Sequence, residues 1–420
     1  MRDRVTFVHV ADAHLDAPFQ GIAAGDERIG RELTEATYRA WERVVDLAIE
    51  RKVDFLVLAG DAYNSADRSL RAQLRFREQV VRLDAAGIST FVVHGNHDPL
   101  GGWSAGLALP ESVHTFPAGS VERIEAIAED GFVCAVYGRS FAKAAETANF
   151  AAGYRRDEAD TLAVGLLHAN VGANADYDPY APCSLDDLRS AGMDYWALGH
   201  IHKHEVLSRD PWAVYAGSPQ GLNPKETGAH GCCVVGVTRN GSVSMEHVDL
   251  APVAWAFAEV DASGAADIDE VERLVSQACE EIRTAAGRAA VVRIAITGRS
   301  SAHADLAHAG AAGQLHEALR RAEAAREPWL LIDRLEDRTR TPLDLDALRT
   351  GQDFAAELLS VADELAASPL VLQKLLDEIA DPLAEKGLKD SAPALSAAEL
   401  LKLARDRALD GLLPEGGEAR

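Results

Sequence analysis

The sequence predicts an α/β protein, and two regularities in its first 250 residues support this class. Short runs of β-branched and aromatic residues alternate with longer segments whose apolar residues recur every three or four positions. Most of the strand-like runs end in Gly or Ala followed by Asp, His or Asn. Open α/β sheets place their chemistry at the carboxyl ends of strands, so we expect a functional site at these positions.

The predicted elements of this first region follow one another in regular order. Strands are expected at 5–10, 54–59, 89–94, 132–137, 162–167, 195–198 and 213–216, and helices at 27–51 and 67–85. Between two β-like runs in 232–250, Asn240-Gly241 predicts a hairpin that completes the sheets. The second helix carries Arg68, Arg71, Arg75 and Arg82 on one side, which we interpret as a solvated face, with a binding surface as the alternative.

Two further regions follow the first. Residues 254–335 predict a βαβαβ unit with strands at 254–260, 290–297 and 329–335, helices at 268–286 and 314–325, and a mobile connection at 300–313. Because it lacks the polar motifs, we expect this unit to cover or orient a substrate. The Leu-, Ala- and Glu-rich remainder predicts helices at 345–367, 369–386 and 396–413, which pack either on this chain or on a partner. The predicted domains are therefore 1–252, 253–340 and 341–420.

Composition narrows the class of protein further. At 420 residues, two or three domains are expected, and no apolar stretch is long enough to predict a membrane span, so a cytoplasmic location is expected. The five cysteines form no Cys-x-x-Cys pair, which favours reduced thiols over disulfides or a thiolate zinc site. A net charge of −24 works against non-specific attraction to nucleic acid, which would then depend on metal ions and local basic faces.

Five predicted strand ends carry side chains that can bind a metal ion. Each motif alone has an ordinary explanation, because Asn and Asp after Gly are common turn formers and a surface His needs no ligand. Their recurrence at five strand ends favours one shared metal centre. The donors are Asp12 and His14 after the first strand, Asp61 after the second, Asn96 after the third, then His168, and finally His200 and His202.

The chemistry of these seven donors indicates which ions they suit. They offer oxygen and nitrogen without sulfur, which suits Mn²⁺, Fe²⁺ or Zn²⁺ and argues against Ca²⁺ or an iron–sulfur cluster. Seven donors are too many for one tetrahedral ion, so two ions bridged by Asp61 are expected. Such pairs promote phosphoester hydrolysis. His9 and His94 lie inside apolar strands and are instead predicted to be buried, hydrogen-bonded core residues.

In this order and spacing, the five motifs resemble the calcineurin-type metallophosphoesterase family. The resemblance implies a β-sandwich flanked by helices and two divalent metal ions. It assigns one ion to Asp12, His14, Asp61 and His202, and the other to Asp61, Asn96, His168 and His200. It also implies that His97 stabilises the transition state and protonates the leaving oxygen, and that Asp98 holds the ring of His97.

Four stretches, 12–19, 95–99, 170–185 and 217–228, resemble the DNA-repair exonuclease branch typified by SbcD and, more nearly, by bacterial YhaO-like proteins. That resemblance implies a Mn²⁺-dependent DNA nuclease with a capping domain and a helical tail. The tail is expected to dock on an SMC-like coiled-coil ATPase, and pairing of two copies of this chain is a further possible assembly. Asn64 departs from relatives that often carry a second Asp there. In the last stretch, Gln220 and Lys225 either contact substrate or form a structural turn.

Three functions therefore compete. The first is a two-metal DNA exonuclease or endonuclease acting in repair. The second is a phosphodiesterase or phosphatase for small molecules, which the acidic composition suits better. The third is a non-catalytic regulatory subunit of an ATPase complex, against which the complete set of ligand positions argues.

Overall fold

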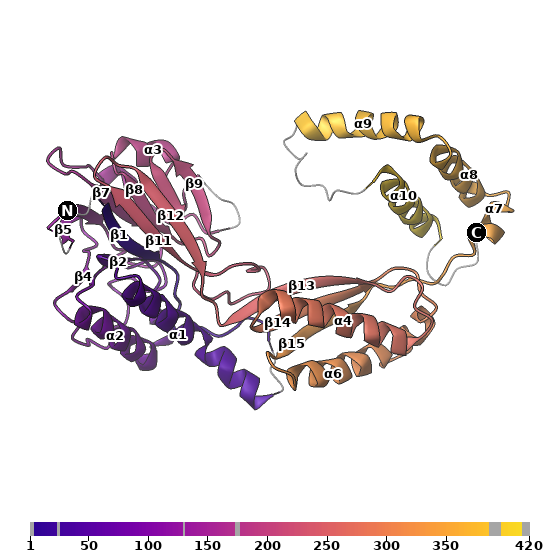
Figure 1. Cartoon of the computed structure of the whole chain (residues 1–420), viewed down its shortest axis with the longest axis horizontal. Coiled ribbons are helices and arrows are strands. Elements are labelled where there is room, and N and C mark those ends of the chain that lie inside the picture. The colour runs from indigo at the N-terminus through magenta and orange to yellow at the C-terminus, as the bar shows by residue number, and fades with distance from the viewer. Residues whose placement is uncertain (1–3, 23–25, 129–130, 173–176, 386–395, 414–420) are drawn as a thin grey trace. The chain divides into compact units, whose positions relative to one another are not determined.

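Two six-stranded sheets packed face to face form the core of the N-terminal region (Figure 1). The first sheet runs in the order β12 (Val243–Asp249), β11 (Gly231–Thr238), β1 (Arg4–Val10), β2 (Phe55–Ala59), β3 (Ser89–Val93) and β4 (Val113–Thr115). The second runs β5 (Glu122–Ile127), β6 (Val133–Gly138), β7 (Ala163–His168), β8 (Tyr195–Gly199), β10 (Trp212–Tyr215) and β9 (Glu205–Arg209). The computed structural model describes residues 4–22, 26–128, 131–172, 177–385 and 396–413.

Apolar side chains from both sheets meet in the middle of this sandwich. Phe7 on β1 stacks on Phe55 of β2 at 4.9 Å and meets Tyr195 of β8 edge-on at 5.5 Å. Buried residues of β3, β6, β7 and β11 complete the same cluster. Because β1 to β4 are mutually parallel, as are β6, β7, β8 and β10, the carboxyl ends of the central strands gather at one edge of each sheet.

Helices cover the outer face of each sheet. The helices α1 (Glu27–Glu50) and α2 (Leu70–Ala85) bury Trp41, Val44 and Phe76 against the first sheet. Asp26 caps α1 by accepting hydrogen bonds from the backbone N–H groups of Arg28 and Ile29. The short helix α3 (Leu185–Ser190) packs on the second sheet. The predicted α/β class and the sandwich flanked by helices are confirmed.

A three-stranded sheet follows the sandwich along the chain. It has the order β13 (Val253–Asp261), β14 (Ala289–Thr297) and β15 (Leu330–Asp337), with helices α4 (Ile268–Ala286), α5 (His303–Leu306) and α6 (Ala311–Ala324). The remaining helices are α7 (Leu345–Arg349), α8 (Phe354–Ala366), α9 (Pro369–Glu385) and α10 (Ala397–Leu412). The predicted end of the α9 segment at residue 386 lies outside the described residues.

The chain divides into two compact units, and the division passes through this small sheet. One unit comprises Met1–Ala258, Val275–Ile294 and Gly313–Leu335, and the other comprises Glu259–Leu274, Ala295–Ala312 and Glu336–Arg420. The boundaries predicted after residues 252 and 340 remain predictions. Within the described ranges, no helix is both long and apolar enough to cross a membrane.

Several local expectations were wrong. The connection at 300–313 contains α5 and the start of α6, and the short strands β4, β5 and β9 were not predicted. Arg68 lies outside α2, in a left-handed turn with φ of 48°. The other arginines of the predicted basic face pair with carboxylates, Arg71 with Glu35 and Arg82 with Asp46 at 2.6 Å, which agrees with a solvated, charge-paired face.

Candidate metal centre

The loops that follow β1, β2 and β3 of the first sheet meet the ends of β7 and β8 of the second. The backbone N–H of His200, after β8, donates to both carboxylate oxygens of Asp12 at 3.0 and 3.1 Å. Nδ1 of His168, the last residue of β7, lies 2.9 Å from the carbonyl oxygen of Ala59 at the end of β2. These contacts join segments more than 100 positions apart and place the predicted donors in one region.

Several of the predicted metal ligands have an unusual backbone conformation that directs their side chains toward the candidate metal centre. Asp12, His14, Asp61 and His200 all have positive φ angles, of 52°, 40°, 55° and 101°. Residues other than Gly rarely adopt this conformation, and each instance costs roughly 1–3 kcal/mol. Four of the seven predicted ligands therefore have a strained backbone. This indicates that the strain is retained because it directs their side chains toward the site.

The donors form two overlapping groups. In one, ligand atoms of Asp12, His14 and His202 all lie within 4.8 Å of one another, and in the other those of Asp12, Asp61 and His168 do. Nε2 of His14 lies 3.1 Å from Nε2 of His202 and 3.8 Å from Oδ2 of Asp61. Nε2 of His168 lies 3.4 Å from the same Asp61 oxygen. Both Asp12 and Asp61 therefore lie between the two groups of imidazoles.

The remaining two predicted donors adjoin the second group. Oδ1 of Asn96 lies 2.9 Å from Nε2 of His168, and the His200 ring lies 5.3 Å from the His168 ring. The structure thus brings together all seven predicted donors, each of which is buried or half-buried. Their assignment as ligands of particular ions remains a prediction.

Each of the four imidazoles uses one ring nitrogen to contact an oxygen at the periphery of the site. Such second contacts are typical of metal-bound histidines, because they fix the tautomer and orient the opposite nitrogen. The pairs are His14 Nδ1 with Asn64 Oδ1 at 3.0 Å, His168 Nδ1 with the Ala59 carbonyl at 2.9 Å, His200 Nε2 with the Asp178 carbonyl at 2.9 Å, and His202 Nδ1 with Glu226 Oε1 at 2.9 Å.

This pattern fits divalent cations. If Nδ1 carries the proton in both His14 and His202, two nitrogen lone pairs face each other at 3.1 Å, an arrangement that a cation stabilises. Burial raises the pKa of Asp12 to about 6, and burial together with the nearby Asp98 charge raises that of Asp61 to about 7. Positive charge placed between these carboxylates would reverse both effects.

The pKa of His202 also indicates that the site stabilises a positive charge. Burial lowers its pKa, but the hydrogen bond with Glu226 and the charge of Asp12 outweigh burial and raise the pKa to about 9. By contrast, burial lowers the pKa of His200 to about 3 and that of His14 well below its usual value. Three imidazoles are therefore neutral, as metal ligands must be, and binding of a cation would displace the proton from His202.

His97 lies at the exposed rim of this centre. Its ring meets that of His14 edge-on at 4.9 Å, and its backbone N–H donates to Oδ1 of Asp61 at 2.8 Å. The side chain is exposed, so it can reach a substrate that the buried donors hold. This placement suits the predicted role of His97 beside a leaving oxygen.

The expected contact between Asp98 and His97 was wrong. Asp98 points back beneath the loop, where its carboxylate accepts hydrogen bonds from the backbone N–H groups of Asp61, Ala62 and Gly95. The imidazole that it contacts is His94, whose Nδ1 lies 3.2 Å from Oδ2. Burial raises the pKa of Asp98, but the contact with His94 and the hydrogen bonds from backbone N–H groups outweigh burial and lower it. These contacts hold the carboxylate away from His97.

His9 is buried and hydrogen-bonded inside β1, as predicted, whereas the prediction for His94 was wrong in part, because this residue follows the end of β3 and is half-buried. His9 bridges the sheets, with Nδ1 3.0 Å from the Tyr195 hydroxyl and Nε2 3.1 Å from the Leu198 carbonyl. His94 contacts Asp98 through its Nδ1. Neither belongs to the two groups of candidate ligands found among the described residues.

One residue that supports the centre from outside, Glu226, was not predicted. Glu226 binds His202, and its other oxygen accepts from the Leu222 N–H at 2.6 Å, but a carboxylate within a Gly- and Pro-containing loop gives no sequence signal of this role. Gln220 is buried and bonds both backbone groups of Val253, so it forms a structural turn. Asn64, which departs from the family pattern, orients His14.

Comparison with known proteins agrees with this geometry. Residues 5–204 match the family described as calcineurin-like phosphoesterase, and residues 255–340 match the middle domain of metallophosphoesterase YhaO. A Bacillus subtilis protein called uncharacterized metallophosphoesterase YhaO is 38% identical over 345 residues, covering 82% of this chain and 84% of that protein.

More distant relatives carry the name DNA double-strand break repair protein Mre11. The Thermoplasma acidophilum protein is 26% identical over 260 residues, covering 59% of this chain and 65% of that protein. The Methanopyrus kandleri protein is 29% identical over 297 residues, covering 64% and 61%. The family match and the YhaO similarity over most of both chains show that this protein belongs to the calcineurin-like metallophosphoesterases.

Proposed function

We propose that this protein is a two-metal phosphodiesterase that cleaves DNA in repair. The observation that carries the proposal is the convergence of seven oxygen and nitrogen donors from both sheets, with the outer nitrogen of each histidine held by an oxygen. The similarity to proteins named for double-strand break repair supports DNA as the substrate. We further propose Mn²⁺ as the native ion, with Fe²⁺ or Zn²⁺ as alternatives.

The chemistry that two divalent cations supply at such a centre is a lowered pKa of the attacking water and neutralisation of phosphate charge. We assign one ion to Asp12, His14, Asp61 and His202, and the other to Asp61, Asn96, His168 and His200. The short distances of both Asp12 and Asp61 to the imidazoles make Asp12 a second candidate for a shared ligand.

The protein's own residues then position and protonate the substrate. The exposed His97 ring lies beside His14, where it can donate a hydrogen bond to a phosphate oxygen. As water adds to phosphorus and loses a proton to solvent, the bond from phosphorus to the leaving oxygen breaks and a proton passes from His97 to that oxygen; His97 then regains a proton from solvent. Asp98 holds the loop that carries His97, through Gly95 and Asp61, and does not contact the His97 ring.

The partner proposal concerns the C-terminal region. The helices α8, α9 and α10 each expose apolar side chains of the kind that helix-in-groove or coiled-coil contacts use, namely Phe354, Val361, Leu370, Val371 and Leu403. We propose that it docks on an SMC-like coiled-coil ATPase. A homodimer is an alternative use of exposed apolar side chains on α2, such as Leu70 and Val81.

A nuclease assay tests the proposal directly. Purified protein incubated with linear and circular DNA should degrade DNA with Mn²⁺ and lose activity in EDTA. His97→Ala should lower the rate by roughly 100-fold or more, because a positioned general acid contributes about 10²–10⁴. His308→Ala, at a position outside the site, serves as the matched control. Hydrolysis of small phosphodiesters without any cleavage of DNA would contradict the proposal.

Small-molecule phosphodiesterase activity is the second candidate, and the net charge of −24 favours it, since polyanions are repelled. A third candidate is a non-catalytic subunit of an ATPase complex. Asp61→Ala separates that role from hydrolysis: a variant without hydrolase activity that still supports full function of its partner would favour it.

A further inference from the structure

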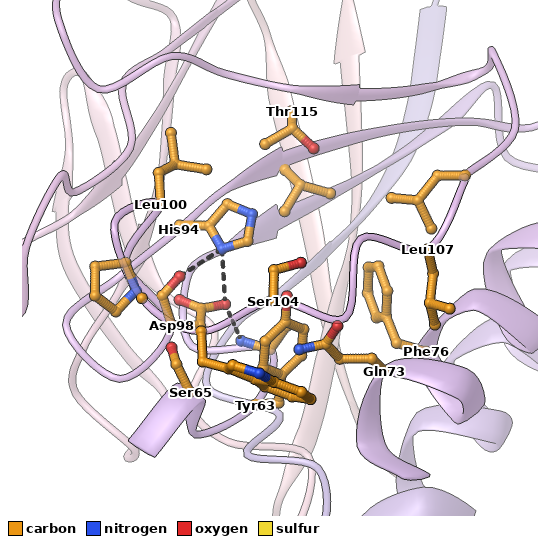
Figure 2. A pocket seen from close by; sticks show the side chains of 16 residues that line it. Tyr63, Ser65, Gln73, Phe76, His94, Asp98, Leu100, Ser104, Leu107 and Thr115 are labelled. Carbon is orange, nitrogen blue, oxygen red and sulfur yellow. Dashed lines mark hydrogen bonds and ion pairs between the residues drawn. The ribbon is translucent and has the colours of Figure 1, made fainter. Parts of the chain in front are cut away.

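A cavity of about 290 Å³ adjoins the metal-binding loops and shares Asp98 with them (Figure 2). Asp98 lines this cavity, while its carboxylate binds the backbone N–H groups of Asp61 and Ala62. Aromatic side chains of Tyr63, Phe76 and Trp103 form much of the wall. Small-molecule sites begin at roughly 300 Å³ and combine such apolar walls with a few polar groups, so the cavity has the size and lining of one.

Gln73 provides a buried NH₂ group that has no hydrogen-bond partner among the described residues. The side chain is only 6% exposed, and its Oε1 accepts a hydrogen bond from the Ala105 N–H at 2.8 Å. Its Nε2 is buried and has no hydrogen-bond partner within the described part of the chain. If the oxygen and nitrogen of the Gln73 amide were exchanged, the Ala105 N–H would lose its acceptor. The orientation is therefore fixed, and the NH₂ group is the part of the amide without a hydrogen bond. A buried donor without an acceptor is unfavourable, and an acceptor on a ligand would remove that cost.

His94 contributes a second polar group to the same cavity. Its Nδ1 lies 2.7 Å from the carbonyl oxygen and 3.2 Å from the carboxylate of Asp98, so its Nε2 is directed away from Asp98 (Figure 2).

These features define the ligand. Among the described residues that line the cavity, Lys and Arg are absent and Asp98 is already paired, so nothing selects a strongly charged ligand. The aromatic walls favour a flat molecule, and the NH₂ group of Gln73 requires an acceptor on its edge. Nucleobases have this combination: every base offers a π-face for stacking and ring-nitrogen or carbonyl acceptors that amide side chains recognise.

We propose that this cavity binds a nucleobase. Two sources share that chemistry, a free nucleoside and a base of a DNA strand held at the metal centre. Binding of a free nucleoside requires no hydrolysis, whereas the DNA source rests on the proposed function. Occupancy would place the base directly against the His94–Asp98 pair that holds the loops of the metal centre.

Two substitutions test the cavity by different means. Gln73→Glu keeps an oxygen for the Ala105 N–H and replaces the free NH₂ group with an acceptor. Thr115→Phe enlarges a lining residue on β4 and leaves the Gln73 amide unchanged. The matched control is Gln79→Glu, on the same helix, at the same 6% exposure and outside this cavity. Circular dichroism and thermal unfolding establish that each variant folds.

The probes are adenosine, guanosine, cytidine and thymidine, measured by isothermal titration calorimetry with EDTA present, and a short single-stranded oligonucleotide measured with the His97→Ala variant. We expect at least one nucleoside to bind wild type and Gln79→Glu equally, and to bind both cavity variants at least tenfold more weakly. If only the oligonucleotide shows this dependence, the base comes from DNA. Failure of both probes to bind, or equal binding by wild type and both cavity variants, would overturn the proposal. Because the nucleoside arm excludes metal, its outcome is independent of whether the protein is a nuclease.

Discussion

The carboxylate of Asp98 lies 3.2 Å from Nδ1 of His94 and forms the link between two loops of the metal centre. Its Oδ1 accepts from the N–H groups of Gly95, at 2.7 Å, and Asp61, at 3.2 Å, while Oδ2 accepts from Ala62 at 2.9 Å. One buried charge thus fixes the segments that follow β2 and β3. Asp98 therefore positions the loop that carries His97 and makes no contact with the His97 ring.

Replacing Asp98 with Asn should therefore destabilise the protein. An amide has one oxygen where the carboxylate has two, so at least one buried N–H group loses its acceptor and faces an NH₂ group instead, at a cost of roughly 1–3 kcal/mol. Urea unfolding in EDTA measures this loss without a contribution from bound metal. The control is Asp186→Asn, at a side chain that is 86% exposed, which should leave the unfolding free energy unchanged. Equal stability of the two variants would contradict this role of Asp98.

Gly95→Ala should abolish metal binding while the sandwich remains folded. A Cβ atom at position 95 would lie 2.4 Å from Oδ1 of Asp61 and 2.7 Å from Nε2 of His168, closer than side-chain atoms can approach, so both donors must move. Calorimetric titration with Mn²⁺ measures the effect, and circular dichroism checks the fold. Gly119→Ala meets nothing within 4 Å and should bind Mn²⁺ like the wild type. Unchanged Mn²⁺ affinity in Gly95→Ala would place the ions elsewhere.

Glu226→Gln should weaken Mn²⁺ binding by about 10–100-fold, the usual effect of removing the group that orients a metal-bound imidazole. Glu226 contacts Nδ1 of His202 at 2.9 Å, and an amide can turn its NH₂ group toward that nitrogen and disturb the tautomer. The comparison is Glu205→Gln, an exposed residue on β9. If both variants bind Mn²⁺ with wild-type affinity, Glu226 does not support the centre.

His9 should make stability fall as the pH decreases below about 6.5. Burial outweighs its hydrogen bond with the Leu198 carbonyl and lowers the pKa of His9 in the folded state to about 3, compared with 6.5 for the solvent-exposed histidine of the unfolded chain. Below pH 6.5 the unfolded chain therefore binds a proton that the folded protein does not bind. The contribution to the slope approaches about 1.4 kcal/mol per pH unit between these two values.

The variant His9→Gln tests this pH dependence. Glutamine can still contact the Tyr195 hydroxyl or the Leu198 carbonyl but does not titrate, so its unfolding free energy should vary less between pH 6.5 and pH 4 than that of the wild type. Urea unfolding in EDTA across this range provides the measurement. Parallel curves for the two proteins would show that His9 is not the titrating group.

The sequence by itself determined the α/β class and the composition of the candidate site. Apolar period and strand length are local properties, so they located β1, β2, β3, β7 and β8 and the polar residues that end them. Short edge strands such as β4 and β9 carry too few residues for a period to emerge, and the Ala- and Gly-rich segment around α5 resembles a loop in composition.

Only the tertiary structure decided how these residues are arranged. The partner of Asp98, the orientation of His202 by Glu226 and the contact of His168 with the Ala59 carbonyl depend on backbone direction and on neighbours up to 109 positions away. Residue identity states which atoms a side chain can offer. Each imidazole has two ring nitrogens, and the nitrogen that contacts a peripheral oxygen leaves the other nitrogen facing the centre. The position of that oxygen is set by the tertiary structure, because each histidine contacts an oxygen from a different segment of the chain.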